Sequence, residues 1–338
     1  MKHVLLVDLS LNGREYGALR SLEAEIVNQT GALIIEIPQI HYPLEKLKMN
    51  QSMRLASVRK LIPKKRFQIN ADVIWCVLMG PENYKLDIFK EWNLVAKYRV
   101  VYLFDTFRHQ LQCISRLFSN NIFNIKITSF NDAIPMLEEA TGYKWHHIEQ
   151  GADPVIFKPQ QISERKIAFS SYGRKDLKMH ENIKLFCKKK NLYYDFTTEI
   201  NAVPIVDAQE LYQQYAWHLC QSIFTISWAV EKTNPSRAKD LRPITCRWFE
   251  AAVSNTILLG QKPDNVHFDN YFPPNFVLPL NSEKSAEDLQ IELELIWENR
   301  FQLYDEKLLV FNKQMHRWTW QSRVDEIIII INNLAHTQ

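Results

Sequence analysis

Two series of short apolar runs, alternating with amphipathic stretches, limit the folds that this sequence can adopt. Each apolar run has the length of one buried strand, and each amphipathic stretch can form a helical crossover. This alternation is typical of a parallel β-sheet covered by helices. The apolar runs of the first series lie at residues 4–7, 33–37, 73–78, 100–104 and 125–129, and those of the second at residues 167–170, 193–196, 223–227 and 256–259.

The amphipathic stretches predict the helices that connect these strands. They lie at residues 13–28, 53–62 and 131–140 in the first series, and at 176–189, 208–215, 247–253 and 286–297 in the second. Between the two series, glycine and proline interrupt residues 151–159, which show no periodicity. We therefore expect an α/β protein with two Rossmann-like, doubly wound domains in tandem.

The C-terminal segment differs from both series. It contains five consecutive isoleucines at residues 327–331, which cannot all lie on one side of a helix. We expect this segment to be buried on several sides. The predicted domains are residues 1–155, residues 156–310, and a C-terminal helix in residues 311–338 that packs back on the first domain.

Length, charge and cysteine content exclude several classes of protein. With 338 residues the chain is long enough for two domains, and its net charge of +3 argues against a dedicated nucleic-acid-binding protein. No uncharged apolar run reaches about 18 residues, and the apolar run at 4–7 ends in Asp8, so we expect neither a membrane span nor a signal peptide. The five cysteines are scattered, which favours a reducing, cytoplasmic compartment over disulfides or a zinc site.

The most informative stretch is the one around the helix predicted at 247–253. Thr245 can cap a helix that carries Arg247 and Glu250 near its start. A helix N-terminus attracts a diphosphate through its N–H groups and dipole, and a carboxylate there can accept hydrogen bonds from ribose hydroxyls. The alternative is a plain capping box with Arg247 in solvent.

Several motifs of the second half resemble one family. Arg247-x-Phe249-Glu250-Ala251, followed by a strand, resembles the R-x-F-E-A-x-A-x-G segment of glycosyltransferases related to the spore-maturation and group-1 families. Three further pieces agree with that family in order, and the likeness covers about residues 150–331. They are Gln150 to Pro159, similar to a G-x-D-x-x-x-F-x-P linker, Tyr172-Gly173-Arg174 after a strand, and Trp320 to Arg323, similar to a T-x-x-x-R helix.

This resemblance implies a GT-B fold, in which two Rossmann-like domains face a cleft. It implies that Glu250 holds the ribose of a nucleoside-diphosphate sugar, while Arg174 and Lys178 face the diphosphate. Two cations there can neutralise the leaving group, so the resemblance implies neither a metal nor a cofactor. The alternative for Arg174 and Lys178 is a solvated basic helix start.

Two positions depart from the family pattern. Arg242 stands where many retaining members carry a glutamate, and Asn255 stands near the position of a family glycine. The contacts to the donor sugar and the choice between retention and inversion therefore stay open.

In the first domain, a loop joins the first strand to the first helix. Gly13 and Gly17 allow a backbone to approach a ligand closely. The resemblance to GT-B enzymes implies that this loop lies across the cleft from the donor phosphates and that Gly13 contacts the donor. The loop has the spacing of neither a dinucleotide fingerprint nor a P-loop. A turn without a ligand is the alternative.

Asp105 and His109 follow the strand predicted at 100–104. The carboxyl ends of parallel strands meet at the ligand crevice, so both residues are candidates for deprotonating an acceptor. The alternatives are a helix-capping aspartate and a surface histidine. His146 and His147 lack a third ligand at metal spacing, which favours a structural pair.

A basic cluster surrounds the helix predicted at 53–62. Such a patch, running from Arg54 to Arg66, can meet an anionic membrane at its cytoplasmic face or a lipid-linked acceptor, although a solvated basic face is the alternative.

The sequence thus predicts a metal-independent glycosyltransferase in polysaccharide or glycoconjugate biosynthesis. It would move a sugar from a nucleoside diphosphate to a hydroxyl of a glycan, lipid or protein. Arg174, Lys178, Arg247 and Glu250 would hold the donor, and Gly13, Asp105 and His109 would present the acceptor. The alternatives are a nucleotide-sugar epimerase of the same fold and a non-catalytic binding subunit. The base, the sugar, the acceptor and the oligomeric state stay open.

Overall fold

The computed structural model describes residues 1–8, 16–37, 65–67, 69–81, 89–118, 121–197 and 208–336. Its contacts divide the chain into two compact units. Unit 1 comprises Met1–Asn12, Leu22–Ile148 and Glu326–Gln338, and unit 2 comprises Gly13–Ser21 and Glu149–Asp325. The domain limits that the sequence suggests, at residues 155 and 310, stay a prediction.

Unit 1 is built on a parallel sheet of six strands in the order β2-β1-β4-β6-β7-β8. Every residue of β4 is buried, as expected for a central strand covered on both faces, whereas β2 lies at an exposed edge. The strands are β1 (His3–Val7), β2 (Leu33–Glu36), β4 (Val73–Leu78), β6 (Tyr98–Leu103), β7 (Ile125–Thr128) and β8 (His146–His147), and a separate pair is formed by β3 (Lys65–Arg66) and β5 (Phe89–Lys90).

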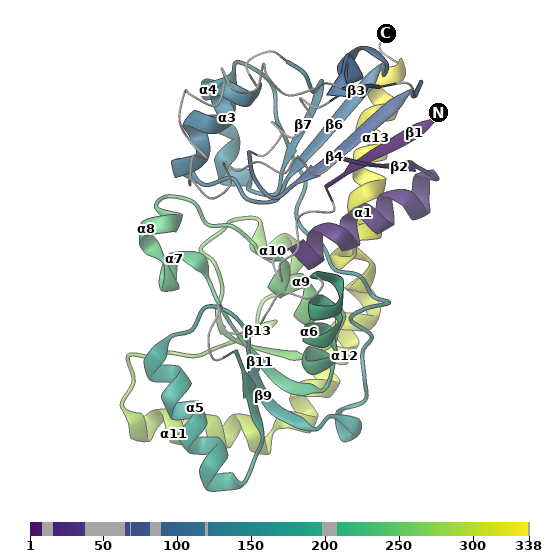
Figure 1. The fold of residues 1–338 in the computed structure, drawn as a ribbon. Coiled ribbons are helices and arrows are strands. Elements are labelled where there is room, and N and C mark those ends of the chain that lie inside the picture. Colours follow the sequence, from purple (N-terminus) through teal and green to yellow (C-terminus); the bar gives the residue numbers. More distant parts are fainter. Residues whose placement is uncertain are drawn as a thin grey trace. The chain divides into compact units, whose positions relative to one another are not determined.

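Two of the described helices of unit 1, α1 and α4, match predicted crossovers, whereas α3 was not predicted. α3 and α4 pack together (Figure 1). α1 buries Leu19, Leu22 and Ile26. The strand order reverses direction between β1 and β4, the point at which such sheets bind ligands. The helices are α1 (Gly17–Thr30), α3 (Leu111–Phe118) and α4 (Ile134–Thr141), with short 3-10 turns at Trp92–Leu94, Arg108–Gln110 and Asn131–Ala133.

Unit 2 repeats this design with five parallel strands in the order β10-β9-β11-β12-β13. The order in which successive strands are added to the sheet reverses between β9 and β11. The central strand β11 is buried throughout, and its Phe224 lies opposite Ile257 of β12. The strands are β9 (Ile167–Ser171), β10 (Tyr194–Phe196), β11 (Ser222–Trp228), β12 (Ile257–Gln261) and β13 (Val277–Pro279).

Helices cover both faces of the unit 2 sheet. α5, α11 and α12 contribute Phe186, Leu293 and Tyr304 to one hydrophobic core, while α6 and α9 contact the same strands (Figure 1). The helices are α5 (Leu177–Lys190), α6 (Ala208–Cys220), α7 (Val230–Thr233), α8 (Pro235–Ala238), α9 (Cys246–Val253), α10 (Phe268–Tyr271), α11 (Ala286–Glu298), α12 (Arg300–Gln314) and α13 (Trp320–His336), with 3-10 turns at Ile162–Glu164 and Met315–Trp318.

The predicted fold class is confirmed, because each unit is a doubly wound parallel sheet. The C-terminal helix also joins the first unit as predicted, since α13 groups with unit 1 from Glu326 on. The isoleucine run was predicted wrongly in part: Ile327 and Ile331 are buried four residues apart, but Ile329 is 57% exposed. The helix predicted at 53–62 lies outside the described residues. Within the described residues, no helix is long and apolar enough to cross a membrane.

Two arginines hold irregular backbone within unit 2. Arg323 of α13 donates hydrogen bonds to the carbonyl oxygens of Gln150 and Arg317 and lies over the rings of Phe249 and Tyr271. The neighbouring Gly151 leaves no space for a side chain, because a Cβ there would lie 2.8 Å from the carbonyl carbon of Thr319. Gly151 thus allows the linker to approach the start of α13 closely, and the buried Arg323 bonds to the linker backbone.

Arg165 plays the same part at the amino ends of the strands. Its buried guanidinium donates to the carbonyl oxygens of Ser222, Ser254 and Asn255 at 2.5, 2.8 and 3.1 Å. Burial lowers the pKa of Arg165, and the group lies over the ring of Tyr304. These bonds connect the segments that enter β9, β11 and β12.

We predict that Arg165→Met lowers the free energy of unfolding of unit 2 by about 3 kcal/mol or more, because several buried carbonyl groups would lose their donor. Urea unfolding followed by circular dichroism measures this loss. The exposed neighbour provides the control, since Lys166→Met should change stability by less than about 0.5 kcal/mol. Equal stability of Arg165→Met and wild type would show that the bonds are dispensable.

Candidate functional site

The loop that follows β9 lies at the point where the unit 2 sheet reverses direction. Gly173 in this loop has a φ of 81°, which favours glycine. A Cβ atom on Gly173 would overlap the guanidinium group of Arg247. Arg247, in the first turn of α9, therefore lies directly against the backbone of this loop. Its role at the donor site stays a prediction.

The start of α5 adds positive potential to the same loop. Asp176 caps the helix by accepting a hydrogen bond from the N–H of Met179 at 2.9 Å. With 14 residues the helix is long enough to carry a full dipole, whose positive end lies at this loop. Arg174 and Lys175 precede the cap. With Arg247, three cationic residues therefore belong to the loop at the end of β9 or lie against it.

The loop is also anchored to β10. The N–H of Gly173 donates to Oγ1 of Thr197 at 3.1 Å, and the hydroxyl of Tyr172 donates to Asp195 at 2.6 Å. Nδ1 of His218 lies 2.5 Å from the same carboxylate. Burial raises the pKa of Tyr172. The backbone of the loop is therefore held in place on both sides of Gly173.

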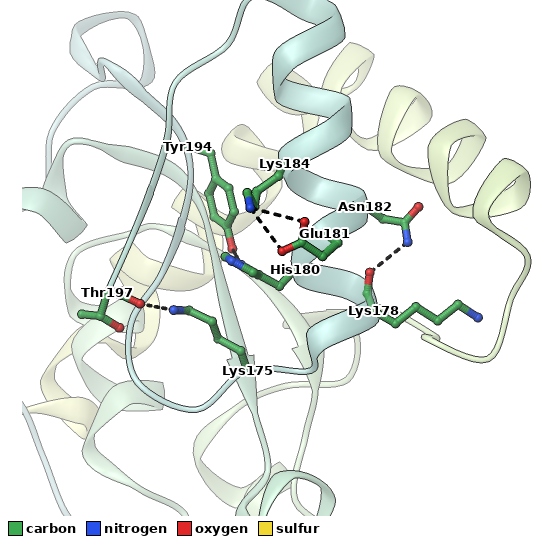
Figure 2. A network of polar contacts seen from close by, with 8 residues as sticks. All are labelled: Lys175, Lys178, His180, Glu181, Asn182, Lys184, Tyr194 and Thr197. Carbon is green, nitrogen blue, oxygen red and sulfur yellow. Dashed lines mark hydrogen bonds and ion pairs between the residues drawn. The ribbon is translucent and has the colours of Figure 1, made fainter. Parts of the chain in front are cut away.

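The lysines around α5 differ in their partners (Figure 2). Lys175 donates to the carbonyl oxygen of Thr197. Lys178 donates to that of Lys284 at 2.8 Å. Lys184 instead forms an ion pair with Glu181 at 3.2 Å. Figure 2 shows the ammonium groups of Lys175 and Lys178 pointing away from each other. The diphosphate role of Lys178 therefore stays a prediction, and Lys175 is the lysine whose side chain follows the loop to β10.

The helix predicted after Thr245 exists as α9. Thr245 occupies the N-cap position of this helix, but its side chain makes no capping hydrogen bond. At the other end of α9, Asn255 has a φ of 51°. Asparagine is, after glycine, the residue that adopts this left-handed conformation most readily, so it can take a backbone position that otherwise favours glycine.

Glu250 is enclosed by aromatic residues rather than exposed to a ligand. Its two oxygens accept hydrogen bonds from the hydroxyls of Tyr212 and Tyr215 at 2.7 and 2.9 Å, and the residue is 1% exposed. Burial raises the pKa of Glu250, although both hydroxyls and the nearby Arg247 oppose the rise. Direct contact with a ribose would need the tyrosines to move. The ribose role thus stays a prediction, and the structure also offers a positioning role for this carboxylate.

The predicted acceptor-side residues follow β6 in unit 1. Asp105 is half-buried, and its N–H donates to the carbonyl oxygen of Met79 at 2.7 Å. His109 is exposed in the turn Arg108–Gln110 and stacks on Phe107 with ring centroids 5.9 Å apart. Their catalytic role stays a prediction. Gly13 and most of the basic patch from Arg54 to Arg66 lie outside the described residues.

Sequence reasoning missed Lys175, Tyr212 and Tyr215. Lys175 was detectable, because it adjoins Arg174 in the loop after a parallel strand. The tyrosines were not, because they come from α6, more than thirty residues before Glu250. Among the described residues, no group of three histidine, cysteine or acidic side chains could hold a metal ion.

No protein-family model matches this sequence, and no curated protein matches it. Solved structures do match. One is UDP-GlcNAc 2-epimerase from Neisseria meningitidis, bound to UDP-GlcNAc, with a TM-score of 0.54 and 10% identity. The match covers 98% of this chain and 100% of the epimerase chain.

TarM structures are similar over a smaller region. A mutant of S. aureus TarM, in complex with fondaparinux, alpha-GlcNAc-glycerol and UDP, matches 77% of this chain with a TM-score of 0.50 and 11% identity. The chain spans 55% of that TarM chain, so a little over half of its length. At such identities the likeness establishes the fold, which is GT-B-like. Membership of the spore-maturation and group-1 families stays a prediction.

The raised pKa of Glu250 predicts a pH-dependent stability difference. Below the unfolded pKa the carboxyl is protonated in both states. As pH rises from the unfolded pKa to the folded pKa, wild type loses stability, because the unfolded chain releases the proton while the buried group keeps it. Glu250→Gln has no such group, so its melting temperature should rise relative to wild type between acidic and neutral pH.

Calorimetry across that pH range measures the difference, and the exposed Glu210→Gln on α6 serves as control. A difference between Glu250→Gln and wild type that stays constant with pH would contradict the assigned burial.

Proposed function

We propose that this chain is a glycosyltransferase that binds a nucleoside-diphosphate sugar at the carboxyl edge of the unit 2 sheet. One observation carries the proposal: the guanidinium of Arg247 lies against the backbone of Gly173, next to the start of α5. A cation, a helix N-terminus and a loop at the sheet's reversal point all favour a bound diphosphate. The GT-B-like fold is consistent with a nucleotide-sugar substrate.

The charges at this edge are available for an anion. Lys175 bonds to a neutral carbonyl group, whereas Lys184 is already neutralised by Glu181 (Figure 2). Lys178 also bonds to a neutral carbonyl group, that of Lys284. Arg247 offers a planar fork that matches two phosphate oxygens. In the transfer reaction the glycosidic C–O bond breaks and negative charge develops on the diphosphate. Cations placed there in advance stabilise that charge and lower the barrier.

The acceptor hydroxyl must lose a proton as it attacks the sugar. We keep Asp105 and His109 as the proposed groups for this step, with support from their place after β6. An imidazole titrates near neutral pH and can take a proton from a hydroxyl. Thr245 and Glu250 are proposed to shape the donor site from α9, Glu250 through Tyr212 and Tyr215.

We predict that Arg247→Met weakens the binding of nucleoside diphosphates about 10- to 100-fold, since it removes charge-assisted hydrogen bonds worth about 1.5–3 kcal/mol. Isothermal titration calorimetry with the diphosphates of uridine, guanosine, adenosine, cytidine and thymidine measures the loss. Lys189→Met is the matched control, because it removes one charge from the opposite end of α5, about 20 Å away. The proposal fails if no diphosphate binds, or if Arg247→Met binds as tightly as wild type.

An epimerase is the second candidate. The full-length similarity to UDP-GlcNAc 2-epimerase favours it, since both chains are covered almost completely. An epimerase needs no acceptor. Proton NMR of the chain incubated with UDP-GlcNAc alone would show a changed sugar configuration for an epimerase and at most slow hydrolysis for a transferase. A non-catalytic subunit would bind the nucleotide and leave the sugar unchanged.

A further inference from the structure

A buried carboxylate follows β11, the strand next to β9 in the unit 2 sheet. Glu231 lies in the short helix α7, three residues beyond the end of β11. Its Oε1 accepts a hydrogen bond from the N–H of Asp264 at 2.9 Å, in the segment that follows β12. Nε of Arg242 lies 3.9 Å from the same oxygen. Glu231 is thus fixed at the carboxyl ends of two neighbouring strands.

The second oxygen of this carboxylate has no hydrogen-bond partner among the described residues. Oε2 of Glu231 is buried, no described residue donates a hydrogen bond to it, and the side chain is only 8% exposed. Burying a polar group without a hydrogen bond destabilises a protein, so such groups are rare and need an explanation. A ligand that donates a hydrogen bond to Oε2 would remove this cost.

The place of Glu231 relates it to the proposed diphosphate site. β9, β11 and β12 are adjacent, and neighbouring strands lie about 4.8 Å apart, so the ends of β9 and β12 are roughly 10 Å apart. Gly173 and Arg247 mark the end of β9, and Glu231 the ends of β11 and β12. A group attached to a diphosphate at β9 would therefore lie within reach of Glu231.

We propose that Oε2 of Glu231 accepts a hydrogen bond from a hydroxyl of the donor sugar and so contributes to the choice of sugar. This assignment rests on the proposed function. A sugar hydroxyl suits the site because it donates a hydrogen bond without adding a charge beside Arg242. A pocket that reads a hydroxyl through a buried acceptor discriminates strongly against sugars that lack the hydroxyl.

The test compares a nucleotide with and without its sugar. Calorimetry would measure the Kd of uridine diphosphate and of UDP-GlcNAc, or of the matching pair for whichever diphosphate binds. Glu231→Gln keeps the size of the side chain and an oxygen for the N–H of Asp264. We expect it to weaken binding of the nucleotide sugar about tenfold, while the Kd of the diphosphate stays within about twofold.

Glu283→Gln is the matched control, since it removes an exposed acid after β13 and should leave both constants unchanged. Melting temperatures show whether each variant is folded, and Glu231→Asp, which withdraws the carboxylate by one methylene, gives a second reading of the same loss. The inference is overturned if diphosphate and nucleotide sugar weaken equally, or if neither does. Failure of wild type to bind any diphosphate would instead overturn the proposed function, and this inference with it.

Discussion

The close approach of Arg247 to Gly173 is the contact on which the proposed donor site depends. A side chain at residue 173 would occupy the volume of the guanidinium, and its backbone would be strained at a φ of 81°. The approach brings the start of α9 to the loop between β9 and α5. A cation from one helix and the positive end of another therefore converge at the point where the sheet reverses direction. An anion is the ligand that such a convergence favours.

The residues that carried the family resemblance serve packing as much as chemistry. Gly151 permits close contact with Thr319, and Arg323 satisfies backbone carbonyl groups of the linker. Glu250 is held by two tyrosine hydroxyls. These motif residues therefore indicate how the second unit of a GT-B-like fold is packed. Chemistry has to be assigned from charges such as Lys175, which forms no ion pair with an acid among the described residues.

Most of the longer strands and helices were predictable, because buried parallel strands are continuous apolar runs such as 73–78 and 223–227. The short strands β3, β5, β8 and β13 and the helix α3 were not predicted. The start of α9 was predictable for a similar reason, since Thr245 precedes an amphipathic segment. α12 was not, because its apolar residues form no clear stripe. The surroundings of Glu250 depend on tertiary contact with α6, which no local pattern contains. Glu231 could have been found with the rule that selected Asp105, because it too follows a parallel strand, but only the structure reveals its unsatisfied oxygen.

The central claim is that the guanidinium resting on Gly173 binds the diphosphate of a nucleotide sugar. A crystal structure grown with the tightest-binding nucleoside diphosphate tests it most directly. The account predicts phosphate oxygens within hydrogen-bond distance of Arg247, at the end of β9 and the start of α5. A nucleotide bound elsewhere, with Arg247 still lying against Gly173 and no phosphate beside it, would contradict the account.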